Sequence, residues 1–283
     1  MVRRHTRSFD LLSTYDNYWP DVRGIFILLG LLLAGALVGE FVIYILGLVF
    51  NTEFVTSYGI LISYPIQFIP AMMYASAKSR SKFFDQTGIP VDEGRFRPIG
   101  AGWMALMVII STIAASLVFE PVCMLLPEMP ERIRNLMEML TNGPLWAIVL
   151  STCIFAPFFE EWLCRGMVLR GMLQKVKPVW AIIISAAFFA IIHMNPWQAL
   201  PAFILGCLFG YVYYKTGSLK LTMLMHCANN AFSVFLSRIP GCEDCDYVYE
   251  IIGDKLTYGI IYAASLALLC LFIARMYKTE FTK

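Results

Sequence analysis

The sequence predicts an all-α membrane protein, a polytopic bundle of about eight transmembrane helices with its active site inside the bilayer. Hydrophobic residues make up 59% of the 283 residues and charged residues only 15%, which is typical of a multi-spanning membrane protein rather than a soluble domain. Apolar runs of about 20 residues recur along the chain, and each could cross a bilayer as a helix. One of these runs contains three charged residues, which are costly in lipid and therefore indicate a functional site.

The eight predicted spans follow the apolar runs in chain order, with an error of several residues at each boundary. They cover residues 24–50, 54–77, 99–126, 145–173, 179–194, 197–214, 219–236 and 256–276. This division predicts a cytoplasmic tail over residues 1–23 and a transmembrane domain over residues 24–276, with a catalytic core near 145–236. Residues 277–283 form a second cytoplasmic tail. The first apolar run is too long for a cleavable signal peptide.

Lysine and arginine are distributed unevenly over the predicted loops. Four of the 22 lie on the outer side, Arg165 lies within the fourth span, and the other 17 lie on the inner side if the N-terminus is cytoplasmic. Cytoplasmic loops carry an excess of positive charge in membrane proteins. We therefore predict an integral multi-pass protein, of the plasma membrane, with both termini in the cytoplasm.

The fourth predicted span contains Glu160, Glu161 and Arg165 in otherwise apolar sequence. A charged side chain near the bilayer centre costs roughly 2.5–3.5 kcal/mol on insertion scales, so these residues must find partners. Glu161 and Arg165 are four residues apart and are expected to form an ion pair that supports the site. Glu160 points about 100° away, so its partner must come from elsewhere in the chain.

Pro157 lacks an N–H and clashes with the Cys153 carbonyl, so a kink there would free a backbone acceptor beside the glutamates. The alternative to a functional site is that Glu160, Glu161 and Arg165 form a charge cluster with a purely structural role in helix packing.

Only two histidines lie in the predicted spans, His193 and His226. If spans four and five form an antiparallel hairpin, His193 lies at the same depth as Glu160, roughly 25 Å from the turn. His226 is closer to its own turn and is expected to be shallower. Asn230 lies one helical turn after His226, and helix geometry prefers it only weakly over Asn229. The alternative for each histidine is a buried residue bonded to a carbonyl.

These residue types suit hydrolysis of a peptide bond by water. A buried glutamate can take a proton from water, and a histidine can orient that water or pass a proton to the leaving amine. A second histidine and an asparagine amide can donate to the developing oxyanion. The spans contain no serine in a nucleophile-elbow pattern and no aspartate. We expect no cofactor. A divalent metal such as zinc is the alternative, although the helical zinc signature of two histidines four residues apart around a glutamate is absent.

Three other features have structural explanations. Gly206 and Gly210 fit close helix packing in the sixth span. Residues 131–140 have an amphipathic pattern that predicts a helix on the outer interface, with a substrate gate as the alternative. Cys242 and Cys245 lie in an acidic outer loop, where we favour a local disulfide or two idle thiols over a metal or redox site.

Three short motifs in successive spans resemble those of the CAAX-processing and bacteriocin-processing (CPBP, or Abi) family of intramembrane glutamic endopeptidases. The motifs are Glu160-Glu161-x-x-x-Arg165, Phe189-x-x-x-His193 and His226-x-x-x-Asn230. Their order and spacing both match, over residues 155–230. The first three spans and the last carry no recognisable signature.

The resemblance implies a helical membrane fold with the site sunk in the bilayer. It implies that Glu160 and His193 activate water and that His226 and Asn230 form the oxyanion hole. It also implies that Glu161 and Arg165 support the site, as the helix spacing suggests independently, with Phe189 in the same motif as His193.

We therefore expect an intramembrane endopeptidase that cleaves a membrane-associated or lipidated protein or peptide. The alternatives are a non-catalytic immunity or scaffold protein of the same fold, a metal-dependent membrane protease, and a proton-coupled carrier, since buried glutamate and histidine also form proton relays. Carriers often contain inverted repeats, and this sequence shows no internal repeat. The expected partners are the substrate and the lipid bilayer, with no nucleic acid.

Overall fold

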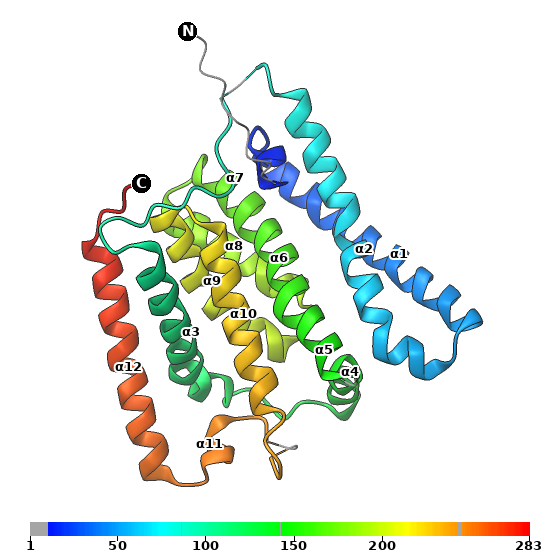
Figure 1. Ribbon diagram of the computed structural model, residues 1–283, viewed down its shortest axis with the longest axis vertical. Coiled ribbons are helices and arrows are strands. Elements are labelled where there is room, and N and C mark those ends of the chain that lie inside the picture. Colours follow the sequence, from blue (N-terminus) through cyan, green and yellow to red (C-terminus); the bar gives the residue numbers. More distant parts are fainter. Residues whose placement is uncertain (1–10, 86, 142, 243–244) are drawn as a thin grey trace.

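A computed structural model describes residues 11–85, 87–141, 143–242 and 245–283, without the side chains of Leu136 and residues 138–141. Within that part of the chain every regular element is a helix, which confirms the predicted all-α class. The first ten residues of the predicted N-terminal tail lie outside it, as do residues 243–244 between Cys242 and Cys245. Helix α1 (Val22–Val49) begins and helix α12 (Lys255–Lys278) ends at the same end of the molecule (Figure 1).

The eight predicted spans all correspond to helical segments. These are α1, α2 (Thr52–Ser81), α3 (Ala101–Cys123), the composite segment Leu145–Leu173, α8 (Pro178–Ile192), α9 (Pro196–Thr216), α10 (Leu219–Leu236) and α12. Side-chain oxygens cap the first turns of five of them, from Asp21, Asn51, Asn195, Ser218 and Asp254. The shorter elements are η1 (Leu11–Tyr15), α4 (Glu131–Thr141) and α11 (Val248–Ile252). Helix α4 matches the helix expected over residues 131–140.

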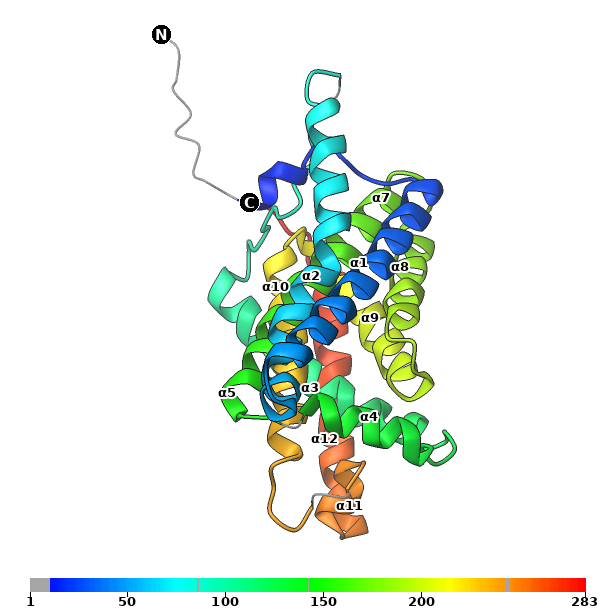
Figure 2. The same ribbon diagram turned by 90° about the vertical axis from the view of Figure 1, so that its right-hand side faces the viewer.

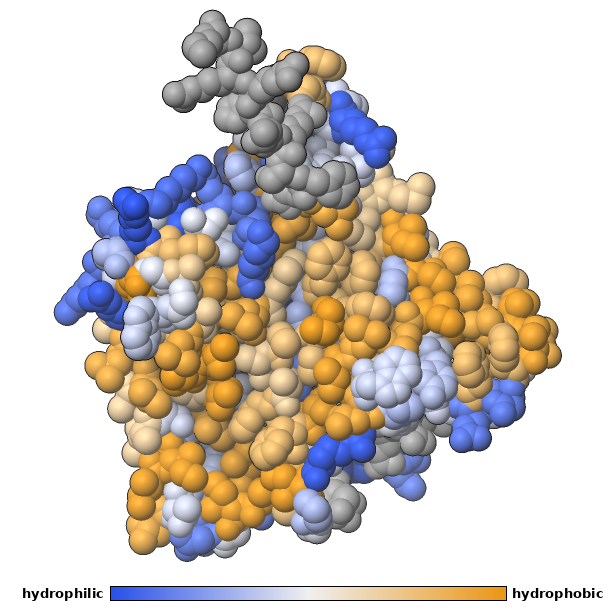
Figure 3. Space-filling view, in the orientation of Figure 1, coloured by the Kyte–Doolittle hydropathy of each residue, from blue (hydrophilic) through white to orange (hydrophobic). Residues whose placement is uncertain are grey.

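Five of these segments are long and apolar enough to cross a membrane: α1, α2, α3, Leu145–Leu173 and α12. The chain is therefore an integral membrane protein, but the predicted count of about eight spans is not confirmed. Helix α8 is apolar and only 15 residues long, while α10 carries polar side chains such as the buried Thr222 and His226. A helix enclosed by other helices does not need a uniformly apolar surface. Figure 3 shows hydrophobic residues over the middle of the visible face and hydrophilic residues towards its ends.

The segment Leu145–Leu173 contains two π-helical stretches. It runs through α5 (Leu145–Ile148), η2 (Val149–Phe155, π), α6 (Ala156–Glu161), η3 (Trp162–Leu169, π) and α7 (Arg170–Leu173). π turns are rare and frequently lie at functional sites. Here they flank the turn that carries both glutamates. The disturbance expected before Pro157 thus takes the form of a wider helical turn.

Two hydrophobic clusters hold the bundle together. The first joins buried side chains of η1, α1, α2, η3 and α8, and the second joins those of α3, α9, α10 and α12. Burial of each large apolar side chain stabilises the fold by about 1.5–3 kcal/mol. Trp162 and Phe189 belong to the first cluster, while Phe209 and Met225 belong to the second. The residues of the predicted site meet at the boundary between the two clusters.

A buried arginine fixes the N-terminal part of the chain to this core. Arg170 is only 2% exposed. Its Nη2 donates to the carbonyls of Tyr15 and Tyr18, and its Nη1 donates to that of Ile89. Arg170 therefore connects the segment before α1 and the loop after α2 to the glutamate-bearing segment. Figure 1 shows the α1–α2 hairpin along one side of the bundle, and Figure 2 views the molecule from that side, with the hairpin in front.

Candidate active site

Glu161 and Arg165 form the ion pair that their spacing predicts. Nη1 of Arg165 donates to Oε1 of Glu161 at 2.7 Å, and both side chains are completely buried. Nη2 of Arg165 donates to the Gly206 carbonyl on α9 at 3.0 Å. The guanidinium carbon also lies 4.6 Å from the ring centre of Phe189 and 5.3 Å from that of Phe209. These partners compensate a charge that would otherwise be too costly to bury.

His226 lies between the two glutamates. Its Nδ1 is 3.2 Å from Oε1 of Glu161, and its Nε2 is 3.9 Å from Oε2 of Glu160. The hydrogen bond to one ring nitrogen fixes the orientation of the imidazole. His226 was expected to be shallower than Glu160, and the structure corrects this expectation. Residue counts from a turn ignore helix tilt and the stagger of neighbouring helices, which decide the final depth.

Glu160 has one bound oxygen and one free oxygen. Its Oε1 accepts a hydrogen bond from the Tyr64 hydroxyl on α2. Its Oε2 is buried and has no hydrogen-bond partner in the described part of the chain, and His226 Nε2 is near it. The partners of Glu160 thus come from other helices, as the helix geometry predicted. Oε2 of Glu161 also lacks a partner among the described residues, but only the Glu160 oxygen has Nε2 of His226 at 3.9 Å, so a water or substrate group could bridge these two atoms.

His193 occupies the end of α8. It is the C-cap residue of that helix, and its Nδ1 lies 2.7 Å from the Phe189 carbonyl. The ring of Phe189 packs edge-on against both histidines, at 4.9 Å from His193 and 5.5 Å from His226. Met194 follows with a φ of 49°, a conformation that side-chain-bearing residues rarely adopt. The pairing of His193 with Glu160 stays a prediction, because the contacts of His193 given above are with Phe189.

The Asn230 amide donates a hydrogen bond to a backbone carbonyl that Pro157 leaves without a donor. In η2 the amide of Ala156 bonds to the carbonyl five residues earlier, that of Ser151. In this register the Thr152 carbonyl would pair with residue 157, a proline without an N–H. Nδ2 of Asn230 donates to that carbonyl instead, at 2.7 Å. The prediction from the sequence assumed α-helical spacing, in which the freed carbonyl is that of Cys153. In the π-helical spacing of the structure the freed carbonyl is that of Thr152.

Asn229 completes a short polar chain. Its Nδ2 donates to Oδ1 of Asn230 at 3.2 Å, and its Oδ1 accepts from Ser116 of α3 at 2.9 Å. Both asparagines are half-buried on α10. Asn230 contacts the segment that bears Glu160, whereas Asn229 faces α3. The choice of Asn230 over Asn229 as a site residue stays a prediction.

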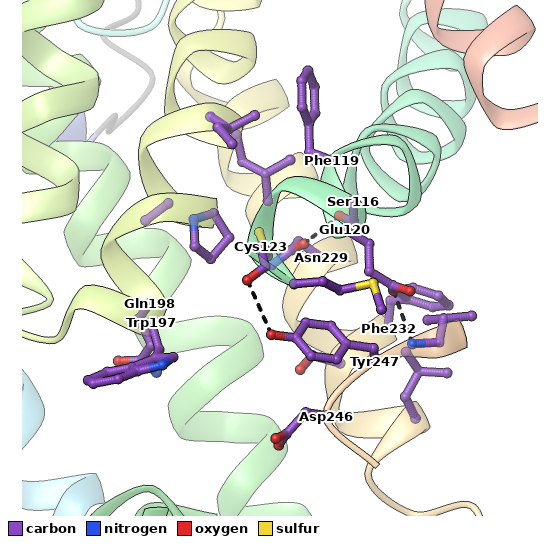
Figure 4. Close-up of a pocket in the computed structure, with 18 of the residues that line it drawn as sticks. Ser116, Phe119, Glu120, Cys123, Trp197, Gln198, Asn229, Phe232, Asp246 and Tyr247 are labelled. Atoms are coloured by element: carbon purple, nitrogen blue, oxygen red, sulfur yellow. Dashed lines mark hydrogen bonds between the residues drawn. The ribbon is translucent and has the colours of Figure 1, made fainter. Parts of the chain in front are cut away.

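A pocket of about 760 Å³ opens between α3, α8, α9 and α10, beside the segment around α11. Its size is within the usual range of ligand sites. His193, His226, Asn229 and Asn230 all line it, together with apolar residues from four helices: Leu117, Phe119, Phe189, Leu205, Phe209 and Phe232. Figure 4 shows several of these side chains around the pocket. Glu160 is not among the described residues that line this pocket; His226 lines it and lies beside the Glu160 carboxylate.

The segment around α11 closes one edge of the pocket (Figure 4). The Tyr247 hydroxyl donates to the Cys123 carbonyl at 3.2 Å, and burial raises the pKa of Tyr247, which keeps this donor neutral. Glu120 at the end of α3 accepts hydrogen bonds from the amides of Val248 and Tyr249, each at 3.0 Å. These contacts fasten the loop between α10 and α12 to the rim.

Sequence reasoning missed Tyr64 and the role of the Thr152 carbonyl. Tyr64 lies 96 residues before Glu160 in a span without a motif, so no spacing connects the two. The Thr152 carbonyl becomes an acceptor only in the π register, which the residue pattern does not predict. Among the described residues, no group of three histidine, cysteine, aspartate or glutamate side chains is arranged to hold a metal ion. The absence of a cofactor stays a prediction, with zinc as the alternative.

Comparisons with known proteins identify the segment that carries this geometry. Residues 142–232 match the family model of the type II CAAX prenyl endopeptidases, Rce1-like. The matched segment, about a third of the chain, is thus similar to the CPBP family. A Bacillus subtilis (strain 168) protein named "Putative membrane peptidase YdiL" is 26% identical over 110 residues, which are 39% of this chain and 44% of that protein. The chain thus matches less than half the length of this relative. No solved structure matches the chain.

The two matches confirm the predicted resemblance and support a membrane protease in general. The matched residues include all three motifs, from Glu160 to Asn230. Helices α1, α2, α3 and α12 lie outside them. The type of catalysis and the roles of single residues do not follow from the matches.

Proposed function

We propose that this chain is an intramembrane endopeptidase that hydrolyses a peptide bond of a membrane-associated protein or peptide, with Glu160 as the general base. One observation carries the proposal. The Oε2 atom of Glu160 is buried without a hydrogen-bond partner among the residues that the structure describes, and the Nε2 atom of His226 lies 3.9 Å from it. A water molecule between these two atoms would contact both and would be held for attack on a carbonyl in the adjoining pocket.

The proposed reaction needs only water as a co-reactant. Oε2 of Glu160 takes one proton from the water while the water oxygen bonds to the scissile carbonyl carbon. The carbonyl oxygen becomes an oxyanion in a tetrahedral intermediate. The same proton is then delivered to the amide nitrogen, the carbon–nitrogen bond breaks, and an acid and an amine leave. A site within the membrane strengthens each of these electrostatic interactions, because the local dielectric constant is low.

The remaining polar groups have distinct proposed roles. Glu161 holds the His226 ring by accepting from Nδ1–H, so Nε2 orients the water as an acceptor. Donation from Nε2 to the oxyanion, which forms from the carbonyl oxygen, would need a proton on both ring nitrogens. The Asn230 amide keeps one N–H after its bond to Thr152, and this N–H is a second oxyanion donor. His193, fixed through Nδ1 by Phe189, presents Nε2 as an acceptor that can help to orient water or carry the proton to the amine.

Cleavage of a peptide library in reconstituted lipid vesicles tests the proposal. Wild type, Glu160→Gln and the control Glu40→Gln are compared, each with and without a strong chelator. Glu40 is also a glutamate within a membrane helix, but it is exposed on α1. We expect cleavage by wild type and by Glu40→Gln that survives chelation, and none by Glu160→Gln.

Other outcomes would favour the alternatives. Loss of cleavage on chelation, with recovery on addition of zinc, would indicate a metal-dependent protease. Normal cleavage by Glu160→Gln would exclude Glu160 as the base. Absence of cleavage by well-folded wild type across the library would favour a non-catalytic immunity or scaffold protein of the same fold.

A further inference from the structure

Tyr64 contacts Glu160 from a helix that lies outside the segment matched by the family model. It lies on α2, whereas the matched residues are 142–232. Its hydroxyl donates to Oε1 of Glu160. That contact occupies one carboxylate oxygen and leaves the other, Oε2, near His226.

Aromatic packing holds the Tyr64 ring in place. The ring centre lies 5.5 Å from that of Phe68 and 6.5 Å from that of Phe159, the residue directly before Glu160. Phe68 and Phe159 stack on each other at 5.1 Å with an interplanar angle of 18°. Phe68 is only 1% exposed and belongs to the first hydrophobic cluster. The tyrosine and the glutamate are therefore supported by the same pair of stacked rings.

We propose that Tyr64 is a positioning residue for Glu160, which fixes the carboxylate so that Oε2 is the oxygen that receives the proton of water. This inference rests on the proposed function, because it deepens the role of the same glutamate. Without the hydroxyl, the Glu160 carboxylate would lose its one observed hydrogen bond. It could then rotate about its terminal torsion, which is broad. The reacting oxygen would no longer be held in a single place.

The hydrogen bond also has an electrostatic consequence. A donor to a carboxylate favours its charged form, so removal of the donor makes the group hold its proton to higher pH. Several other titratable or charged groups lie near Glu160 and stay unchanged in a Tyr64 variant: Glu161, Cys164, Arg165 and His226. A change in the titration of Glu160 on substitution of Tyr64 therefore reports the loss of this one donor.

The first test is the pH dependence of cleavage, with a library peptide that wild type cleaves. In Tyr64→Phe we expect kcat to fall about tenfold and the acidic limb of the kcat profile to move up by about one pH unit, as expected for loss of a hydrogen bond to a charged group. The matched control is Tyr58→Phe, on the same helix, whose ring packs on Phe54 and Trp146. An unshifted acidic limb in Tyr64→Phe would overturn the proposal, even if kcat fell.

The second test does not depend on turnover. Infrared difference spectra of the reconstituted protein across pH contain a carboxyl band that is absent in Glu160→Gln. The midpoint of this band should rise in Tyr64→Phe and fall when 3-fluorotyrosine, a stronger donor of the same shape, replaces Tyr64. The same midpoint in all three proteins would overturn the inference.

The infrared test also separates the inference from the proposed function. Glu160→Gln with full cleavage activity would exclude the proposed base, whatever the spectra show. An inactive Glu160→Gln together with unshifted spectra in the Tyr64 variants would remove only the role of Tyr64.

Discussion

Oε1 of Glu161 lies 3.2 Å from Nδ1 of His226, across 65 residues of sequence. The same oxygen accepts a hydrogen bond from Nη1 of Arg165 at 2.7 Å. One carboxylate oxygen thus connects the buried arginine to the imidazole and holds that ring by the nitrogen farther from Glu160. The pair accounts for the two adjacent glutamates: Glu161 orients the histidine through Nδ1, and Glu160 lies beside Nε2 of the same ring.

Substitution of Glu161 should destabilise the fold as well as stop cleavage. In Glu161→Gln the Arg165 charge stays buried without its counter-ion, and loss of one partner of a buried pair costs about 3–5 kcal/mol. Thermal unfolding in detergent, followed by tryptophan fluorescence, should show a clear drop in Tm. The matched control is Lys283→Ala, which removes an exposed pair with Glu93 and should cost less than about 1 kcal/mol.

The double variant Glu161→Leu/Arg165→Met separates stability from function. Both charges are removed together, so much of the lost stability should return. Cleavage should stay absent, because His226 has lost the acceptor for its Nδ1. Recovery of cleavage in the double variant would contradict the orienting role of Glu161.

Gly206 should tolerate no side chain. A Cβ atom there would lie 3.2 Å from the Cα and Cβ of Ala186 and 3.2 Å from Nη2 of Arg165. We expect Gly206→Ala to destabilise the protein by about 1–3 kcal/mol, because two helix backbones and the guanidinium must move apart. Gly259→Ala is the control, since no heavy atom in the described part of the chain lies within 4 Å of a Cβ at that position of α12. Equal Tm values for the two variants would refute the predicted clash.

Asn230 and Pro157 should be energetically coupled. Asn230→Ala leaves the Thr152 carbonyl without its donor, which should cost about 1–3 kcal/mol. In a Pro157→Ala background residue 157 has an N–H that can serve that carbonyl, so the cost of Asn230→Ala should be smaller. A double-mutant cycle on the free energy of unfolding measures this coupling. Strictly additive values would show that the proline does not create the need for Asn230.

Glu120 should control the order of the pocket rim. In Glu120→Gln one acceptor oxygen for the amides of Val248 and Tyr249 is replaced by an NH₂ group, which cannot accept. Hydrogen exchange over α11 should accelerate by about tenfold or more, while exchange in α10 stays as in wild type. Asp246→Asn is the control, because its pair with Arg134 is exposed and contributes little. Unchanged exchange over α11 would show that other contacts hold the rim.

Much of the local structure could be predicted from the sequence. The Glu161–Arg165 pair follows from the i, i+4 spacing, and the freed acceptor before Pro157 follows from a missing N–H. The helical segments follow from apolar runs and from caps such as Ser218 and Asp254. These features depend on neighbours within about five residues, and backbone geometry fixes such relations once a helix forms.

Only the tertiary structure decided which helices meet at Glu160. Tyr64 and His226 approach it from α2 and α10, and neither contact follows from spacing along one helix. The depth of His226 and the acceptor at Thr152 depend on packing between helices and on the π register. The sequence by itself thus determined the residues available for chemistry and the helices that carry them. Packing decided their partners, because tilt, stagger and helical register are set by the sum of many contacts across the whole bundle.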